Sequence, residues 1–209
     1  IGVAATKAQV DVSTYGGAKQ LMQIALDAYG RVDVLVNNVG GTIWVQPFHE
    51  FTEEQIHHEL QRSLHTTLWC CHAVLPIMIR QNAGSIVNVG SQSPRGLYRL
   101  PYATCKGGFI AMTKVLAMEY GRYNIRVNCV SPGGTEQNDM VTTRLTLKPG
   151  VVAQASDKDK VYREEMFNDI RSQQAIKRSG KPEEQAAAIA FLASDDASFI
   201  TGDVINCSG

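Results

Sequence analysis

The sequence predicts an α/β fold in which helices cover both faces of a doubly wound parallel sheet. Two patterns carry this prediction. Short apolar runs typical of buried strands alternate with segments of helical periodicity, and glycine or polar residues directly follow most of the apolar runs. The chain has 209 residues, of which 44% are hydrophobic, without an internal repeat. That length and composition fit a single domain over residues 1–209 with one sizeable core.

In the first part of the chain, two short strands flank one helix. Residues 8–12 are expected to form a strand that ends in a turn. Residues 14–29 carry apolar side chains at helical spacing, and Gly30 is a natural stop for that helix. Residues 32–36 then form a compact apolar strand, which the polar and glycine-rich segment 37–41 closes.

The middle of the chain predicts two long helices with a strand between them. We expect the helices at about 52–80 and 102–121, and the strand at 85–89. The loop 90–101 joins this strand to the second helix. Ligands of open parallel sheets bind beyond the carboxyl ends of the strands, so the start of this loop should lie at the ligand-binding edge.

The last third of the chain contains the final strands and a segment of different character. Residues 125–130 predict a strand that ends at a Pro-Gly turn. Residues 135–181 are polar and mixed, with a helical stretch around 158–175. A helix over 182–193 and a strand over 204–207 close the chain.

One part of a dinucleotide-binding sheet is missing from this pattern. Such a sheet begins with a strand, a glycine-rich turn and a helix whose N-terminus holds the pyrophosphate. Gly16 and Gly17 precede a helix, but no third glycine and no hydrophobic strand accompany them. We therefore expect the chain to begin about two strands into the domain, without its first strand, glycine-rich turn and first helix.

Charge and cysteine content argue against several classes of protein. Twenty basic residues balance 20 acidic ones without blocks of one sign, so nothing indicates nucleic-acid binding. No signal peptide or membrane-spanning segment is visible. The five cysteines form neither a CxxC pair nor a cluster with histidines. We expect buried free thiols in a cytoplasmic protein, and no metal site.

A tyrosine and a lysine four positions apart, Tyr102 and Lys106, are the strongest candidates for chemistry. Positions i and i+4 project from one face of a helix, and a cation beside a phenol favours the phenolate. Ser91 lies upstream at a strand end, and a Pro-Gly turn lies downstream. Tyr15 and Lys19 share the spacing but lack both flanking features, so we regard that pair as accidental.

In this order and spacing, the motifs resemble the short-chain dehydrogenase/reductase family of Rossmann-like enzymes, over essentially the whole chain. Segment 37–40 is similar to the family's NNAG motif, and 191–202 is similar to its C-terminal signature. The resemblance implies that Ser91, Tyr102 and Lys106 are the catalytic residues. It assigns contacts with a nicotinamide cofactor to Asp11, Val12, Asn38, Gly40, Tyr102, Lys106, Pro132, Gly133 and Thr135.

Two features depart from the family's pattern. The position of an asparagine that helps a proton relay through the lysine is Ser63 here, which makes Ser63 a fourth catalytic candidate. Ser91 and Tyr102 are eleven positions apart, fewer than the family usually has, so loop 92–101 is tightened. Ser93 is the alternative to Ser91.

Within the family, four stretches resemble the dehydrogenases of aromatic cis-dihydrodiol carboxylates: 40–44, 69–73, 95–99 and 132–136. The benzoate type is the nearest match, and the p-cumate type is a close alternative. This resemblance implies NAD-dependent oxidation of a dihydrodiol carboxylate to a catechol. A carboxylate needs a cation, ideally a bidentate one, and Arg95 and Arg99 in the loop before Tyr102 are the candidates, with Arg62 third.

The implied mechanism makes Tyr102 the general base. Free tyrosine has a pKa near 10, so we expect Lys106 and the positive nicotinamide of an oxidised cofactor to lower it. Ser91 would hold the substrate oxygen, and Lys106 would also bind the nicotinamide ribose. Residues 135–181 occupy the place of the family's substrate lid, with a surface insertion as the alternative.

Two other functions stay open: a general ketone or acyl-carrier reductase of the same family, and a catalytically inactive domain that only oligomerises. Family members are commonly homotetramers or homodimers, in which the two long helices meet symmetry mates. The apolar content of both helices agrees with this. The residue that selects NAD or NADP is expected on a strand before Ile1, and the oxidative direction favours NAD.

Overall fold

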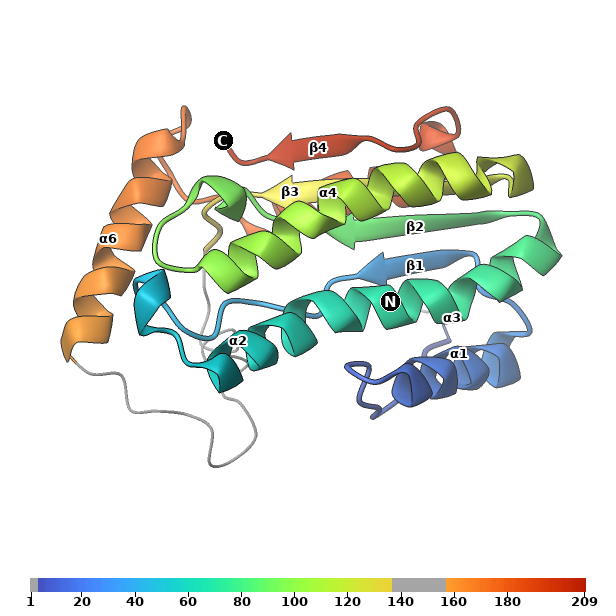
Figure 1. Cartoon of the computed structure of the whole chain (residues 1–209). Coiled ribbons are helices and arrows are strands. Elements are labelled where there is room, and N and C mark those ends of the chain that lie inside the picture. The colour runs from blue at the N-terminus through green and yellow to red at the C-terminus, as the bar shows by residue number, and fades with distance from the viewer. Residues whose placement is uncertain (1–3, 137–156) are drawn as a thin grey trace.

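The structure, a computed structural model, describes residues 4–136 and 157–209. Four strands form one sheet in the order β1-β2-β3-β4, and all three pairings are parallel (Figure 1). The strands are β1 (Val34–Asn37), β2 (Gly84–Val89), β3 (Ile125–Pro132) and β4 (Val204–Cys207). The α-helices are α1 (Tyr15–Tyr29), α2 (Glu53–Leu60), α3 (Thr66–Gln81), α4 (Leu100–Tyr120), α6 (Asp157–Gln173) and α7 (Pro182–Ala193).

Helices cover both faces of this sheet, as the sequence predicts. Helices α3 and α4 run across one face, α7 packs on the other, and α6 stands beyond the carboxyl ends of the strands (Figure 1). Helix α1 packs against α3 near the β1 edge. The polar segments that follow β1, β2 and β3 therefore meet at the edge that faces α6.

Helix α1 forms where the periodicity predicts it. The Thr14 side chain accepts a hydrogen bond from the Gly17 N–H at the N-terminus, and Gly30 ends the helix in the left-handed conformation with φ of 74°. Ala18 and Met22 are buried in the core between α1, α3 and the sheet.

The predicted strand over residues 8–12 does not form. A parallel strand needs a neighbour for its backbone groups, and no described segment pairs with these residues. Instead, the Asp11 side chain accepts hydrogen bonds from the backbone N–H (3.0 Å) and hydroxyl (2.6 Å) of Ser13 and turns the chain into α1. Asp11 is thus exposed in a turn, and Val12 packs against the core.

The long helix predicted at about 52–80 is three successive helical segments. A capping box at Thr52 starts α2, and α3 ends at Gln81. Between them, Gln61–His65 winds as a π-helix, a form that occurs frequently at functional sites. This segment buries Ser63.

The strands differ in how well they are covered. All residues of β2 and β3 are buried or half-buried, as expected for strands with helices on both faces. In β1, Val34 and Val36 are each 41% exposed, while Leu35 and Asn37 are buried. The apolar run of β1 thus has one covered face and one face that the described residues leave open to solvent.

Polar groups inside the core are hydrogen-bonded across the sheet. Asn37 donates through its amide to the Asn88 side-chain oxygen (2.9 Å), and Asn88 donates to the Thr113 hydroxyl (3.0 Å). All three side chains are buried, so this ladder ties β1 to β2 and to α4.

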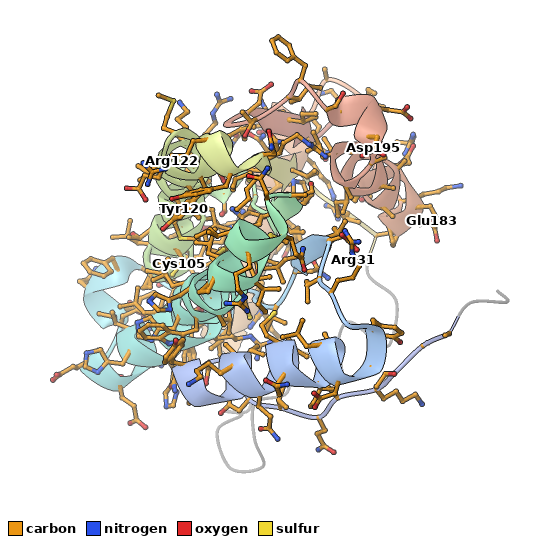
Figure 2. The ribbon with its side chains drawn as sticks, turned by 90° about the vertical axis from the view of Figure 1, so that its right-hand side faces the viewer. Arg31, Cys105, Tyr120, Arg122, Glu183 and Asp195 are labelled. Atoms are coloured by element: carbon orange, nitrogen blue, oxygen red, sulfur yellow. The ribbon has the colours of Figure 1, made fainter. Side chains whose placement is uncertain are left out.

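Several charged side chains of the helices and turns lie at the surface. Figure 2 shows Arg122, Glu183 and Asp195 at the outer surface, while Cys105 is buried within α4. All five cysteines are free thiols, as predicted. Among the described residues, no helix has the length and apolar character needed to cross a membrane.

Candidate active site

The end of β2 carries Ser91 to the carboxyl edge of the sheet. The Gly90 N–H donates to the Val130 carbonyl at 2.7 Å, which holds the turn against β3. A Cβ atom at Gly90 would lie 2.7 Å from the Cys129 sulfur, so this close approach requires glycine. Ser91 therefore has a fixed position directly beyond the sheet.

The first two turns of α4 bring Tyr102 and Lys106 to the same edge. Lys106 is only 4% exposed, and its Nζ donates to the Val89 carbonyl at 2.6 Å. The same Nζ lies 5.7 Å from the centre of the Tyr102 ring. The Ser91 side chain lies close enough to the Tyr102 phenol to lower the pKa of that group. The three residues that the spacing selects are thus neighbours, although they come from two separate elements.

The predicted effect of Lys106 on the pKa of Tyr102 stays a prediction. Burial raises the pKa of Tyr102 above its usual value, and the Ser91 hydrogen bond and the Arg99 charge lower it in part. Lys106 donates instead to the Val89 carbonyl, and burial lowers the pKa of Lys106 itself to about 8. Arg99, whose Cζ also lies 5.7 Å from the ring centre, is a cation that favours the Tyr102 phenolate.

Ser63 lies beneath the glycine segment that follows β1. Its hydroxyl accepts a hydrogen bond from the Gly41 N–H at 3.3 Å. Gly40 has a φ of +149°, and a Cβ atom there would lie 3.5 Å from the Ser63 hydroxyl and 3.7 Å from Lys106 Nζ. Ser63 and Lys106 therefore flank Gly40, and the relay role of Ser63 stays a prediction.

Ser93, the alternative to Ser91, has a different environment. Its backbone N–H donates to the Ser91 hydroxyl at 3.0 Å, and its own side chain is buried. The two serines are thus linked, and Ser91 is the one that lowers the pKa of the Tyr102 phenol.

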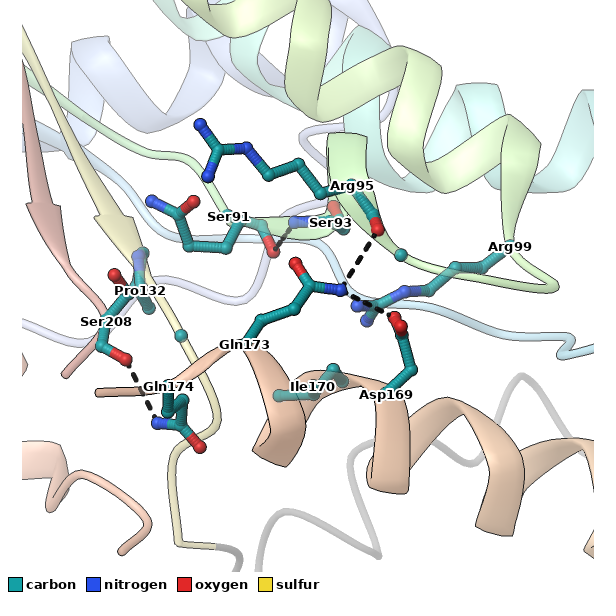
Figure 3. A pocket seen from close by; sticks show the side chains of 13 residues that line it. Ser91, Ser93, Arg95, Arg99, Pro132, Asp169, Ile170, Gln173, Gln174 and Ser208 are labelled. Carbon is teal, nitrogen blue, oxygen red and sulfur yellow. Dashed lines mark hydrogen bonds between the residues drawn. The ribbon is translucent and has the colours of Figure 1, made fainter. Parts of the chain in front are cut away.

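A cavity of about 110 Å³ opens between Ser91 and helix α6 (Figure 3). Both Arg95 and Arg99 line it, together with Asp169 and Gln173 of α6. The Arg99 guanidinium points toward Asp169, whereas the Arg95 side chain is exposed and points away (Figure 3). The backbone carbonyl of Arg95 accepts a hydrogen bond from the Gln173 amide at 3.3 Å.

The two predicted arginines therefore differ in the position of their guanidinium groups, and Arg99 is better placed to bind a substrate carboxylate. Its Cζ lies 5.7 Å from the centre of the Tyr102 ring. Burial lowers the pKa of Arg99, and the charge of Asp169 acts against that shift. Its Nε is buried with no hydrogen-bond partner among the described residues. Arg62, the third candidate, interacts with Glu59 and does not line this cavity.

The residues predicted to contact a cofactor occupy different environments along the sheet edge. The Gly133 N–H donates to the Cys207 carbonyl at 3.2 Å, and a Cβ atom at Gly133 would lie 2.7 Å from the Ser208 carbonyl oxygen. Thr135 pairs with Gly180 through an isolated β-bridge. Pro132 ends β3 and lines the cavity beside Ser91, and Asn38 is exposed after β1.

This set fits the nicotinamide half of a dinucleotide. A buried ammonium at Lys106 matches ribose hydroxyls, and Gly40 allows close approach beside it. Within the described residues, no glycine-rich turn joins a strand to a helix in a pyrophosphate cradle, so the fit concerns only this half.

Sequence reasoning missed three polar residues near the site: Glu59, Asp169 and Gln173. Glu59 is three positions after Ile56 and four before Ser63 on one helical stretch. That spacing could have identified Glu59, because positions 56, 59 and 63 share one face of a helix. A carboxylate on the buried face of a helix is rare unless it has a structural or functional role. Asp169 and Gln173 carry no comparable signal, because only the placement of α6 brings them to the cavity.

Comparison with known proteins gives matches over the whole chain. The family profile described as enoyl-(acyl carrier protein) reductase matches residues 1–209. The 1,6-dihydroxycyclohexa-2,4-diene-1-carboxylate dehydrogenase of Acinetobacter baylyi is 43% identical over 209 residues, which are 100% of this chain and 78% of that protein. The 2,3-dihydroxy-2,3-dihydro-p-cumate dehydrogenase of Pseudomonas putida is 34% identical, over 95% of this chain and 71% of that protein.

Two solved structures superpose on this chain over nearly its whole length. NAD+-bound xylitol dehydrogenase superposes with a TM-score of 0.84 at 28% identity, covering 100% of this chain and 80% of that one. Levodione reductase superposes with a TM-score of 0.78 at 30% identity, covering 96% and 74%. The profile match, the dihydrodiol dehydrogenase relatives and the shared Rossmann-like fold show that this chain belongs to the short-chain dehydrogenase/reductase family.

Proposed function

We propose that this protein oxidises the cis-dihydrodiol of an aromatic carboxylate to a catechol, with NAD as the oxidant. The observation that carries the proposal is the Arg99 guanidinium, which lies 5.7 Å from the Tyr102 ring and lines the same cavity as Ser91. A half-buried cation whose buried Nε–H has no partner among the described residues suits a carboxylate, and its neighbours Ser91 and Tyr102 suit an alcohol. The identity to two kinds of dihydrodiol carboxylate dehydrogenase supports the same substrate class.

Tyr102 is the general base of the proposed reaction. Its phenolate takes the proton from the secondary hydroxyl of the diol, while the Ser91 hydroxyl donates a hydrogen bond to the same oxygen and stabilises its developing charge. Lys106, whose pKa of about 8 lies near neutrality, exchanges the proton that Tyr102 takes up. Ser63, on the other side of Gly40, supports this relay by holding the glycine segment.

The oxidant is a nicotinamide cofactor, which accepts hydride from the carbinol carbon when it is bound. Lys106 would hold its ribose hydroxyls, and Gly40, Pro132, Gly133 and Thr135 would lie beside the nicotinamide. Asp11, Val12 and Asn38 would lie on the adenosine side. The oxidative direction of the reaction supports NAD over NADP.

The carboxylate of the substrate then determines the product. Oxidation of the hydroxyl next to the carboxylated carbon gives a β-keto acid. Loss of carbon dioxide from that acid restores the aromatic ring and gives a catechol, so this step needs little help from the protein. Arg99 therefore selects and orients the carboxylate before the hydroxyl is oxidised, and Arg95 and Arg62 contribute less.

The proposed assembly is a homodimer or homotetramer. Val115 and Met118 of α4 are 53% and 86% exposed, and Leu68 of α3 is 36% exposed. Apolar side chains on these two helices support contacts with a second copy of the chain. The free thiols support a reducing compartment such as the cytoplasm.

A second candidate is an acyl-carrier reductase. The 3-oxoacyl-[acyl-carrier-protein] reductase of Thermotoga maritima is 37% identical over 91% of this chain. Such a substrate carries its reacting ketone on a long neutral arm and needs no buried cation. The position of Arg99 therefore favours the dihydrodiol carboxylate.

The test is nicotinamide absorbance with purified protein, NAD or NADP, and matched cis-dihydrodiols with and without a carboxylate. We expect faster turnover of the carboxylated diols with NAD, release of a catechol, and loss of both in Tyr102→Phe. Preferred reduction of an acyl-carrier ketone would support the second candidate. No turnover of any diol, with a folded protein and saturating NAD, would reject the proposal.

A further inference from the structure

A carboxylate outside the proposed catalytic set is buried beneath the active site. Glu59 lies in the last turn of α2 and is only 1% exposed. Its Oε1 atom accepts hydrogen bonds from the backbone N–H groups of Ile43 (2.6 Å) and Trp44 (3.1 Å). Its Oε2 atom is buried with no hydrogen-bond partner among the described residues. A carboxylate is almost never buried this deeply without a structural or functional reason.

The two N–H groups belong to residues 40–46, which follow β1 and which we call the strap. One side of the strap is held by Glu59. On the other side, the Ile43 carbonyl accepts a hydrogen bond from Arg163 of α6 at 3.2 Å. The last residue of the strap donates through its N–H to the Tyr98 carbonyl at 2.7 Å. The strap thus links the buried carboxylate to α6 and to the loop before α4.

Helix α6 has a second attachment just beyond the strap. Lys158 Nζ lies 2.6 Å from the Glu50 carboxylate. The other end of α6 carries Asp169 and Gln173 to the cavity that Arg99 lines, so the strap and the cavity contact the same helix.

Glu59 also lies against the helix that carries the reacting phenol: the Cys105 thiol, three positions after Tyr102 on α4, donates to the Glu59 backbone carbonyl at 3.8 Å. A negative charge at Glu59 raises the pKa of Tyr102, whereas Arg99 lowers it. Burial raises the pKa of Glu59 itself to about 7, and two backbone hydrogen bonds and Arg62 act against that shift. The charged and titratable groups that face this pair are Arg62, Arg99, Cys105 and, beside Cys105, Lys106.

We propose that Glu59 is a positioning residue of the active site: it fixes the strap on which α6 docks, and its negative charge opposes formation of the Tyr102 phenolate. The inference deepens the proposed function and rests on it, because it treats Tyr102 as the base. It gives one buried carboxylate two measurable effects, one on the geometry of the cavity and one on the pH dependence of the base.

Glu59→Gln tests the charge, because glutamine keeps the shape and an oxygen that can accept both backbone hydrogen bonds. Without the negative charge, Tyr102 loses its proton more easily, so the rising limb of kcat/KM should move to lower pH. The tyrosinate absorbance that Tyr102→Phe removes should shift in the same direction. Glu54→Gln, on the same helix with an 84% exposed side chain, is the matched control and should titrate like the wild type.

Glu59→Ala tests the strap, because it removes both acceptors. Amide hydrogen exchange at Ile43 and Trp44 should accelerate, and protection in α6 should fall, while Glu59→Gln keeps both. KM should rise roughly tenfold or more, with a smaller change in kcat, because a bond to a charged acceptor is lost. If Glu59→Ala does not fold, Glu59→Gln still decides the role of the charge.

Two results would overturn the inference: a tyrosinate titration of Glu59→Gln that coincides with the wild type, or unchanged exchange in folded Glu59→Ala. Neither measurement uses a substrate. Failure of every dihydrodiol to turn over would therefore reject the proposed function without deciding the role of Glu59.

Discussion

Replacement of Arg99 by glutamine separates binding of the carboxylate from the chemistry of the alcohol. In the proposed complex, Arg99 donates to a carboxylate in a cavity of about 110 Å³ that is partly shielded from water. A hydrogen bond to a charged group contributes about 1.5–3 kcal/mol. Since about 1.4 kcal/mol is tenfold in affinity, KM for the carboxylated diol should rise about 10- to 100-fold. KM for the matched diol without a carboxylate should stay within about twofold of the wild type.

The same substitution has a second effect that does not depend on the carboxylate. Arg99 lowers the pKa of Tyr102, so its loss should raise that pKa further. Tyr102 would then become deprotonated only at higher pH, and the rising limb of kcat/KM should move to higher pH for both diols. Steady-state kinetics at several pH values with both diols measure the two effects together.

The matched control is Arg95→Gln, because Arg95 lines the same cavity but its exposed side chain points away (Figure 3). Its kinetic constants should stay within about twofold of the wild type. Circular dichroism and a thermal melt establish that both variants fold. If Arg99→Gln changes neither KM for the carboxylated diol nor the pH limb, or if Arg95→Gln has the larger effect, the assignment of the cation is wrong.

Three further substitutions test other parts of the site. Asp169→Asn removes the negative charge beside the carboxylate anchor and should lower KM several-fold for carboxylated diols only, as steady-state kinetics would show. Gly133→Ala places a methyl group 2.7 Å from the Ser208 carbonyl oxygen, so it should lower the free energy of unfolding by about 1–3 kcal/mol in denaturant unfolding. Gly107→Ala, which has open space around the new methyl group, is the control and should leave that free energy unchanged. Asn88→Leu removes the donor to the buried Thr113 hydroxyl and leaves the Asn37 amide only its bond to the Cys71 sulfur, so it should cost about 1–3 kcal/mol in urea unfolding. An unchanged midpoint would contradict the buried ladder.

Local pattern was enough to predict most of the helices and strands. Helices α1, α4 and α7 and strands β2 and β4 lie within about two residues of their predicted ranges, because their periodicity and end signals are local in sequence. The meeting of Ser91 with Tyr102 and Lys106 was also predictable, since it follows from the parallel order of the strands.

The strand over 8–12 was not predictable in this way. An apolar alternation specifies a strand only where a neighbour accepts its backbone hydrogen bonds, and none of the described segments pairs with these residues as a strand. The π-helical turn at Gln61–His65 was equally invisible, because one extra residue in a turn leaves the helical pattern almost unchanged.

The sequence by itself determined the fold class, the choice of Ser91, Tyr102 and Lys106 as catalytic candidates, and the presence of arginines in the loop before Tyr102. Only the tertiary structure decided that the Arg99 side chain, rather than that of Arg95, points toward Asp169. It also decided that Arg99 lowers the pKa of Tyr102 and that a charge at Glu59 raises it. The reason is physical. Periodicity and spacing place residues on elements, whereas the strength of a charge depends on burial and on distances between side chains far apart in sequence.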